Sequence, residues 1–181
     1  VCQQACKQHR LWQQQGLPAL TMSVNLSGVQ FESNRLEQDI VAALALENVD
    51  PQYVTLEVTE SILMSAQSAS SRAIAPIETM ESLSELGIKI AIDDFGAGHA
   101  TFSYLKTLPV DFVNIDSMFV RDLADNDNDY AMVKSINEIS HLMGKLTVAK
   151  FVDSEATLAR LKELEVDYSQ GSALSEREVL E

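Results

Sequence analysis

The chain has 181 residues, of which 46% are hydrophobic and 22% are charged, and its formal net charge is −14. This composition suffices for one sizeable hydrophobic core and differs from that of a disordered chain. The negative charge disfavours nucleic acid polymers and anionic lipids as partners, and the apolar runs are much shorter than the ~20 residues of a membrane-spanning helix.

Apolar segments and amphipathic segments alternate along the chain. The apolar segments predict strands, and the amphipathic segments predict helices, several of which end at a glycine or a proline. In chain order we expect a helix at 1–15, a strand at 20–26, a helix at 35–46, a strand at 53–58, a helix at 71–86, a strand at 88–92, a short helix at 100–107, a strand at 110–115, a helix at 129–143, a strand at 146–149, a helix at 154–164 and a short strand at 166–169.

Strand–helix repetition with short connections predicts an α/β fold with a parallel sheet. Six strand–helix units fit either an open doubly wound sheet or part of an eight-stranded barrel. No GxGxxG motif follows the first strand and no Walker lysine motif is present, which weakens the nucleotide-binding sheet. A full barrel has ~250 residues and this chain begins within a helix, so we expect a single partial domain over 1–181 that lacks the first strands of its fold.

The cysteines and histidines form no recognisable metal motif. Cys2 and Cys6 share one face of the first helix, where packing explains them better than a zinc site. His9, His99 and His141 are scattered. Sparse cysteine fits a reducing cytosol.

Polar residues stand at or near the carboxyl ends of the predicted strands. These ends meet at one edge of a parallel sheet, so we expect the side chains to lie near one another. In chain order they are Asn25, Glu57, Glu60, Asp93, Asp94, Asn114, Asp116, Lys150 and Gln170, the last of which is followed by Gly171. Asn and Asp also cap strands and helices, but capping does not explain why five strands in succession end this way. An edge rich in oxygen ligands is typical of a Mg²⁺, Mn²⁺ or Ca²⁺ site.

A set of short motifs resembles a known family. The motifs are Ser23-Val-Asn-Leu-Ser27, Leu56-Glu-Val-Thr-Glu-Ser61, Asp93-Asp-Phe-Gly-Ala-Gly98, Ser103-Tyr-Leu-Lys106, Leu108-Pro-Val-Asp111, Ile115-Asp116, Phe119-Val-Arg-Asp122 and Gln170-Gly171. At these residues the chain resembles the EAL domains, bacterial phosphodiesterases that open cyclic di-GMP. The resemblance spans essentially the whole chain. It implies a modified TIM-like barrel in the cytoplasm, joined to GGDEF or sensor domains in a parent protein that is sometimes anchored in a membrane.

The resemblance also implies metal-binding roles. Asn25, Glu57 and Asp93 match ligands of a first metal ion, and Asp94 and Asp116 match ligands near a second. In an intact family member these ions are Mg²⁺ or Mn²⁺. The glutamate of the signature Glu-Ala-Leu, another ligand, lies before the region that this chain covers, and so does an arginine that contacts ligand phosphate.

Three further positions match by resemblance. Glu60 matches the glutamate that steadies the loop after the paired aspartates, here 95–101, and that loop also serves the family's dimer contact. Gln170 and Gly171 match the start of the family's last ligand-binding segment.

The chain departs from the family where the chemistry takes place. Asn114 stands where the family has a lysine near the attacking water, and Lys150 stands where it has a metal-binding glutamate. Phe151 replaces a glycine, and 172–177 has neither the aromatic residues nor the proline of the family's ligand loop. These departures predict a degenerate site without intact catalytic residues and without a bound metal.

Lys150 allows two interpretations. In the first, its ammonium neutralises Glu57, Asp93 and Asp94 in place of a metal ion, so that the fold is kept and the activated water is lost. In the second, the side chain simply points to solvent.

Three functions follow from these observations. The first is a catalytically inactive EAL domain that serves as a regulatory, ligand-sensing or protein-interaction module, with cyclic di-GMP or other domains as partners. The second is a Mg²⁺- or Mn²⁺-dependent cyclic di-GMP phosphodiesterase with residual activity. The third is a structural fragment that assembles through the open edges of its sheet.

Overall fold

The computed structural model describes residues 1–31, 33–63, 76–98 and 102–174. The chain divides into two compact units, Val1–Ala91 with Leu108–Val110 and Ile92–Thr107 with Asp111–Glu181. The strands form one sheet in the order β1-β2-β3-β4-β5-β6. Neighbours in the sheet are therefore also successive strands in the sequence.

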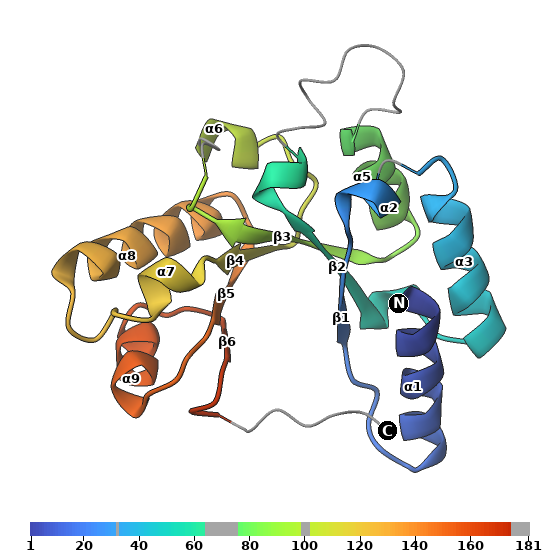
Figure 1. The fold of residues 1–181 in the computed structure, drawn as a ribbon, viewed down its shortest axis with the longest axis horizontal. Coiled ribbons are helices and arrows are strands. Elements are labelled where there is room, and N and C mark those ends of the chain that lie inside the picture. The colour runs from blue at the N-terminus through green and yellow to red at the C-terminus, as the bar shows by residue number, and fades with distance from the viewer. Residues whose placement is uncertain (32, 64–75, 99–101, 175–181) are drawn as a thin grey trace. The chain divides into compact units, whose positions relative to one another are not determined.

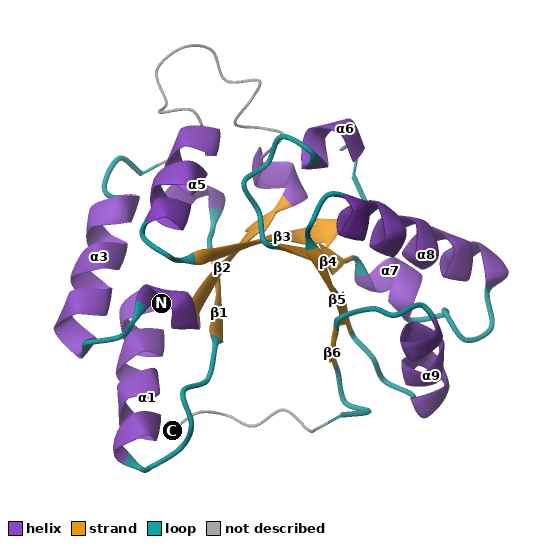
Figure 2. Ribbon diagram, turned by 180° about the vertical axis from the view of Figure 1, so that it is seen from behind, coloured by secondary structure: helices purple, strands orange, loops and turns teal. Residues whose placement is uncertain are grey.

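The first unit contains a parallel strand pair and its covering helices. Its elements are α1 (Cys2–Gln14), β1 (Met22–Asn25), α2 (Gly28–Phe31), α3 (Leu36–Glu47), a 3-10 turn η1 (Pro51–Tyr53), β2 (Val54–Thr59) and α5 (Pro76–Glu85). β1 and β2 pair from Met22 opposite Val54 to Asn25 opposite Glu57. α1 packs against α3, and the two helices lie side by side in Figures 1 and 2.

The second unit begins within β3 (Lys89–Phe95), whose first residues belong to the first unit. It continues with α6 (Phe102–Leu105), β4 (Phe112–Ile115), α7 (Ser117–Val120), α8 (Asp127–Leu142), β5 (Leu146–Lys150), α9 (Glu155–Glu163) and β6 (Tyr168–Gln170). β5 pairs in parallel with both β4 and β6. The register places Asn114 opposite Val148 and Lys150 opposite Gln170.

Local sequence explains where the long elements start and stop. The side chain of Asn126 accepts hydrogen bonds from the first N–H groups of α8, and Ser154 accepts one from the Thr157 N–H at the start of α9. Gly144, at φ 71°, takes the left-handed conformation that ends α8. The apolar residues of the central strands are almost fully buried, as in a sheet covered on both faces.

The predicted alternation of strands and helices is confirmed, and so is the α/β fold class. The sequence did not predict α2, α7 or η1, because each is about one turn long and too short to show a periodicity. β3 extends through Asp93 and Asp94 to Phe95, and β6 lies at Tyr168–Gln170 rather than 166–169. Parts of the helices expected at 71–86 and 100–107 lie outside the described residues.

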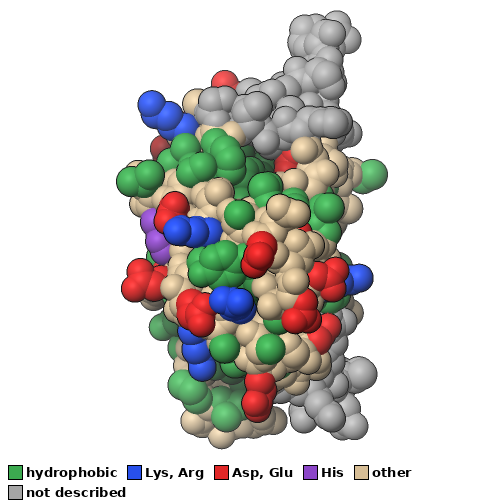
Figure 3. All heavy atoms as spheres, turned by 90° about the vertical axis from the view of Figure 1, so that its left-hand side faces the viewer, with side chains coloured by type: hydrophobic (Ala, Val, Ile, Leu, Met, Phe, Trp, Pro, Cys, Tyr) green, Lys and Arg blue, Asp and Glu red, His purple; other side chains and the backbone are tan. Residues whose placement is uncertain are grey.

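One face of the second unit carries acidic, basic and hydrophobic side chains. Figure 3 shows the side of the molecule that carries α8 and α9, where acidic and basic side chains are interspersed with small hydrophobic areas. This view shows no continuous basic strip of the kind that tracks a phosphate backbone. Within the described ranges, no helix has the length and hydropathy needed to cross a membrane.

Candidate ligand site at the strand carboxyl ends

In the first unit, the structure places Asn25 and Glu57 on neighbouring strands. They are register partners at the carboxyl end of the β1–β2 pair, and the Leu26 N–H donates to the Glu57 carbonyl at 2.9 Å. Asn25 is exposed, whereas Glu57 is buried. Glu60 is also buried, directly after β2. The strand register thus places Asn25 opposite Glu57, and the metal roles that the resemblance implies for these two residues stay predictions.

In the second unit, three of the predicted residues meet at one oxygen atom. Asp93 Oδ1 accepts a hydrogen bond from Asn114 Nδ2 at 3.1 Å and one from Lys150 Nζ at 2.7 Å. The side chains of Lys150 and Asp93 are only 16% and 13% exposed. Lys150 therefore turns to Asp93 and not to solvent. The two residues that depart most from the family pattern are the two that bind this carboxylate.

The carboxylate of Asp116 has a local structural role. Its Oδ1 accepts the Met118 N–H at 2.7 Å and so caps α7, while its own N–H donates to the Phe95 carbonyl at 3.2 Å. Asp94 is exposed and has φ 54°, a left-handed conformation that Asp tolerates better than most residues. The metal roles that the resemblance implies for Asp94 and Asp116 stay predictions.

The ends of β5 and β6 are held tightly together. Val152 N–H donates to the Gln170 carbonyl at 3.1 Å, and a Cβ on Gly171 would lie 2.2 Å from the Val152 carbonyl oxygen. Between Lys150 and Val152, Phe151 has φ 62°, a conformation that favours glycine. The Arg121 guanidinium lies 5.2 Å from the centre of the Phe151 ring, a cation–π arrangement.

The donor groups around Asp93 do not suit a divalent cation. Mg²⁺ and Mn²⁺ require several oxygen ligands that point at the ion, whereas Asp93 Oδ1 already faces an ammonium and an amide NH₂. Among the described residues, no three His, Cys, Asp or Glu side chains are arranged to hold a metal ion. The loop expected at 95–101 and the segment at 172–177 lie partly outside the described residues.

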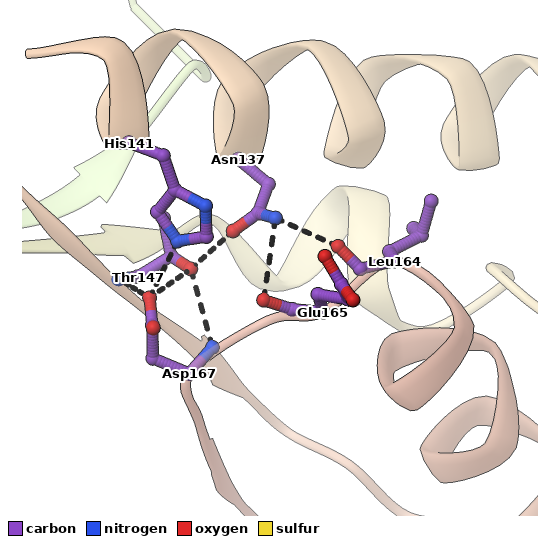
Figure 4. Close-up of polar contacts among 6 residues, drawn as sticks. All are labelled: Asn137, His141, Thr147, Leu164, Glu165 and Asp167. Atoms are coloured by element: carbon purple, nitrogen blue, oxygen red, sulfur yellow. Dashed lines mark hydrogen bonds and ion pairs between the residues drawn. The ribbon is translucent and has the colours of Figure 1, made fainter.

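A second polar cluster was not predicted from the sequence (Figure 4). Asp167 Oδ2 accepts hydrogen bonds from His141 Nε2 at 2.8 Å and from the Thr147 N–H and hydroxyl at 2.7 and 3.1 Å. Asn137 Oδ1 is a second acceptor within reach of the Thr147 hydroxyl, whose single proton is shared between the two oxygens, and Asn137 Nδ2 donates to the Leu164 carbonyl at 2.7 Å. The cluster ties α8 and β5 to the segment that leads into β6.

The cluster lowers the pKa of Asp167. Burial by itself would raise this pKa, but the hydrogen bonds from Thr147 and His141 and the nearby imidazole outweigh it and hold the pKa below its usual value. The four-residue spacing of Asn137 and His141 on one helix face was the available sequence signal. His9, by contrast, is buried and stacks on Tyr53 at 5.4 Å.

Comparisons with known proteins agree with this architecture. The family model of the EAL domain matches residues 1–177. The cyclic di-GMP phosphodiesterase PdeB of Shewanella oneidensis is 36% identical over 165 residues, which are 91% of this chain and 18% of that protein. The bifunctional diguanylate cyclase/cyclic di-GMP phosphodiesterase MucR of Pseudomonas aeruginosa is 36% identical over 174 residues, 96% of this chain and 24% of that protein.

Solved structures give the same result. The structure of the PaMucR phosphodiesterase in complex with c-di-GMP matches with a TM-score of 0.88 and 34% identity, over 97% of this chain and 68% of that one. The EAL domain of Mycobacterium smegmatis DcpA matches with a TM-score of 0.87 and 28% identity, over 96% of this chain and 76% of that one. The chain belongs to the EAL domain family, and it spans at most 24% of the length of these two curated relatives.

Proposed function

We propose that this EAL domain is a regulatory module of a larger cyclic di-GMP signalling protein and does not hydrolyse cyclic di-GMP. The contact between Asn114 and Asp93 carries the proposal. Where the family pattern has a lysine, the amide of Asn114 donates to Asp93 Oδ1 at 3.1 Å. An amide holds no positive charge and takes up no proton near neutral pH, so it replaces neither a cationic partner nor a general base for an attacking water.

The substitution at the end of β5 supports the same proposal. The family pattern has an acid at the position of Lys150, and here the residue donates a hydrogen bond to Asp93 at 2.7 Å instead of offering an oxygen. Residues of one catalytic site act as a unit, and each loss typically costs orders of magnitude in rate. Two such changes on one carboxylate are consistent with the loss of turnover.

Binding of cyclic di-GMP is the form of regulation that we propose to test first. The matched MucR structure is a complex with c-di-GMP, and Gln170 and Gly171 keep the residue types of the family's ligand segment. A module that contacts a protein partner instead is the other form of the same proposal.

Two assays on the whole chain test the proposal. The first incubates the chain with cyclic di-GMP and millimolar Mn²⁺ or Mg²⁺ and measures the linear product, with the MucR phosphodiesterase domain as a positive control. We expect no product above the protein-free blank. Turnover within about 100-fold of the MucR domain would contradict the proposal, since losses at a site of this kind are larger.

The second assay is calorimetric titration of cyclic di-GMP with EDTA and then with Mn²⁺. Micromolar binding in EDTA supports ligand sensing. No binding in either condition supports the protein-interaction form.

A residual Mg²⁺- or Mn²⁺-dependent phosphodiesterase is the alternative. The 36% identity to PdeB and MucR favours it, as does the presence of Asn25, Glu57 and Asp93 at their family positions. It predicts slow turnover that EDTA abolishes and that Asn114→Lys increases.

The surroundings of the domain are also part of the proposal. Since the chain spans only 18% and 24% of PdeB and MucR, we propose that its parent protein carries a GGDEF or sensor domain and that this domain works in the cytoplasm. A homodimer through the loop at 95–101 is proposed from the family resemblance, and light scattering at increasing concentration would detect it.

A further inference from the structure

Lys150 and Asp93 form an ion pair that is largely withdrawn from water. The N–O distance is 2.7 Å, and the two side chains are 16% and 13% exposed. A pair this close and this shielded is screened by salt much less than a surface pair, and breaking it leaves a charge without compensation. The other donor on the same oxygen, Asn114, is neutral, so within this contact Lys150 supplies the positive charge.

The backbone around Lys150 is held against β6 and the residues that follow it. Lys150 is the last residue of β5 and lies opposite Gln170 in the β5–β6 register. Two residues later the Val152 N–H donates to the Gln170 carbonyl at 3.1 Å, and the Ala173 N–H donates to the Val152 carbonyl at 3.0 Å. These hydrogen bonds fix the backbone at Lys150. Only the side chain therefore loses conformational entropy when the ammonium binds Asp93.

A divalent cation at Asp93 would have to displace this ammonium. The approaching ion carries two positive charges and meets a fixed one at the same oxygen atom, and it gains no ligand from Asn114 Nδ2, which is a donor. Mg²⁺ also gives up its water ligands reluctantly. Displacement therefore costs the existing ion pair before the cation can bind Asp93 Oδ1.

We infer that Lys150 is a permanent counter-ion of Asp93 and prevents divalent cations from binding there. The stability of the chain and ligand binding at this strand end are therefore independent of Mg²⁺ and Mn²⁺. This inference goes beyond the proposed function, because it concerns metal binding by the chain and holds whether or not cyclic di-GMP is bound or hydrolysed.

The test compares the whole chain with Lys150→Met, which removes the charge and keeps a similar length, and with Lys150→Glu, which adds an oxygen ligand. Lys134→Met is the matched control, because Lys134 forms an exposed pair with Glu138 at 3.9 Å in the same unit. Each protein is melted with EDTA and with millimolar Mn²⁺, and Mn²⁺ binding is measured by electron paramagnetic resonance without any nucleotide.

The expected results differ for each variant. In EDTA, K150M melts roughly 5–10 °C below the parent chain and K150E lower still, while K134M is unchanged. Mn²⁺ leaves the parent chain and K134M unaffected, raises the melting temperature of K150E by several degrees, and binds K150E at least about 10-fold more tightly than the parent.

Three results would overturn the inference. They are equal melting temperatures for K150M and the parent chain, Mn²⁺ binding by the parent chain as tight as by K150E, and the absence of any Mn²⁺ response in K150E. Because these readouts involve no cyclic di-GMP, a failure here is distinct from a failure of the proposed function.

Discussion

Gly171 leaves no room for a side chain. A Cβ at this position would lie 2.2 Å from the carbonyl oxygen of Val152 and 2.3 Å from its nitrogen. These are backbone atoms, and Val152 is itself held by hydrogen bonds to Gln170 and Ala173. The glycine that the family resemblance marks as a ligand position therefore also has a packing reason to be glycine here.

We expect Gly171→Ala to lower the free energy of unfolding by roughly 2 kcal/mol or more, because the β5–β6 ends must separate to admit the methyl group. Urea denaturation measures the loss. Gly28→Ala is the control: a Cβ there meets Ile62 at an ordinary 3.7 Å, so the change should stay within about 1 kcal/mol. Equal losses in the two variants would argue against the close approach.

At the scale of elements, the short edge strand β6 depends on side chains from two other elements. β6 has three residues, and the segment before it is bound by Asn137 and His141 of α8 and by Thr147 of β5. Asp167 collects three of these hydrogen bonds on one oxygen (Figure 4). The cluster thus sets the register that places Gln170 opposite Lys150.

We expect Asp167→Asn to destabilise the protein by roughly 1 kcal/mol at pH 7, because an amide is a weaker acceptor than a carboxylate for these donors. The pKa of Asp167 is lower in the folded protein than its ordinary value, so the folded state favours the charged form. That stabilisation is complete above the unfolded pKa of about 3.9 and is lost as the pH falls through the lower folded value.

Urea titrations of both proteins at pH 7 and at several values below 4 check this. The stability difference should shrink in the acid range. The control Asp122→Asn changes an exposed carboxylate and should alter stability by less than about 0.5 kcal/mol at any of these pH values. A difference that grows on acidification would contradict the assigned direction of the pKa shift.

At the scale of the whole chain, charge is the dominant property. The chain has 27 Asp and Glu against 13 Lys and Arg, a net charge of −14. Self-repulsion of this size opposes folding into a compact state, and salt screens it. The interspersed basic residues on the face in Figure 3 relieve the repulsion only locally.

We therefore expect the melting temperature to rise by a few degrees between 20 and 300 mM NaCl, because the Debye length falls from about 20 Å to about 6 Å. Differential scanning calorimetry measures the change, and choline chloride at the same ionic strength should give the same shift if screening is the cause. A melting temperature that falls with salt would mean that attractive surface pairs outweigh the net repulsion.

The order of the strands and long helices could be predicted from the sequence, because apolar runs, helix caps and glycine stops are local signals. Ser154 and Gly144 mark helix ends in the sequence and act there in the structure. The sequence also shows Asn114 and Lys150 where the family pattern has a lysine and a glutamate, so a degenerate site could be predicted without the structure. The single-turn helices could not be predicted, because they are too short to show a periodicity. The end of β3 could not be predicted either, because it depends on pairing with neighbouring strands.

Which of these residues contact one another depends on the folded structure. Asn114 is 21 positions from Asp93 along the chain, and Lys150 is 57 positions from it. A shift of one residue in a strand's register would turn a side chain to the opposite face of the sheet. The same holds for the cluster around Asp167, whose members come from α8, β5 and the approach to β6. Residues that are distant in the sequence meet through strand register and packing, which no local pattern encodes. The contact between Lys150 and Asp93 therefore appears only in the folded chain.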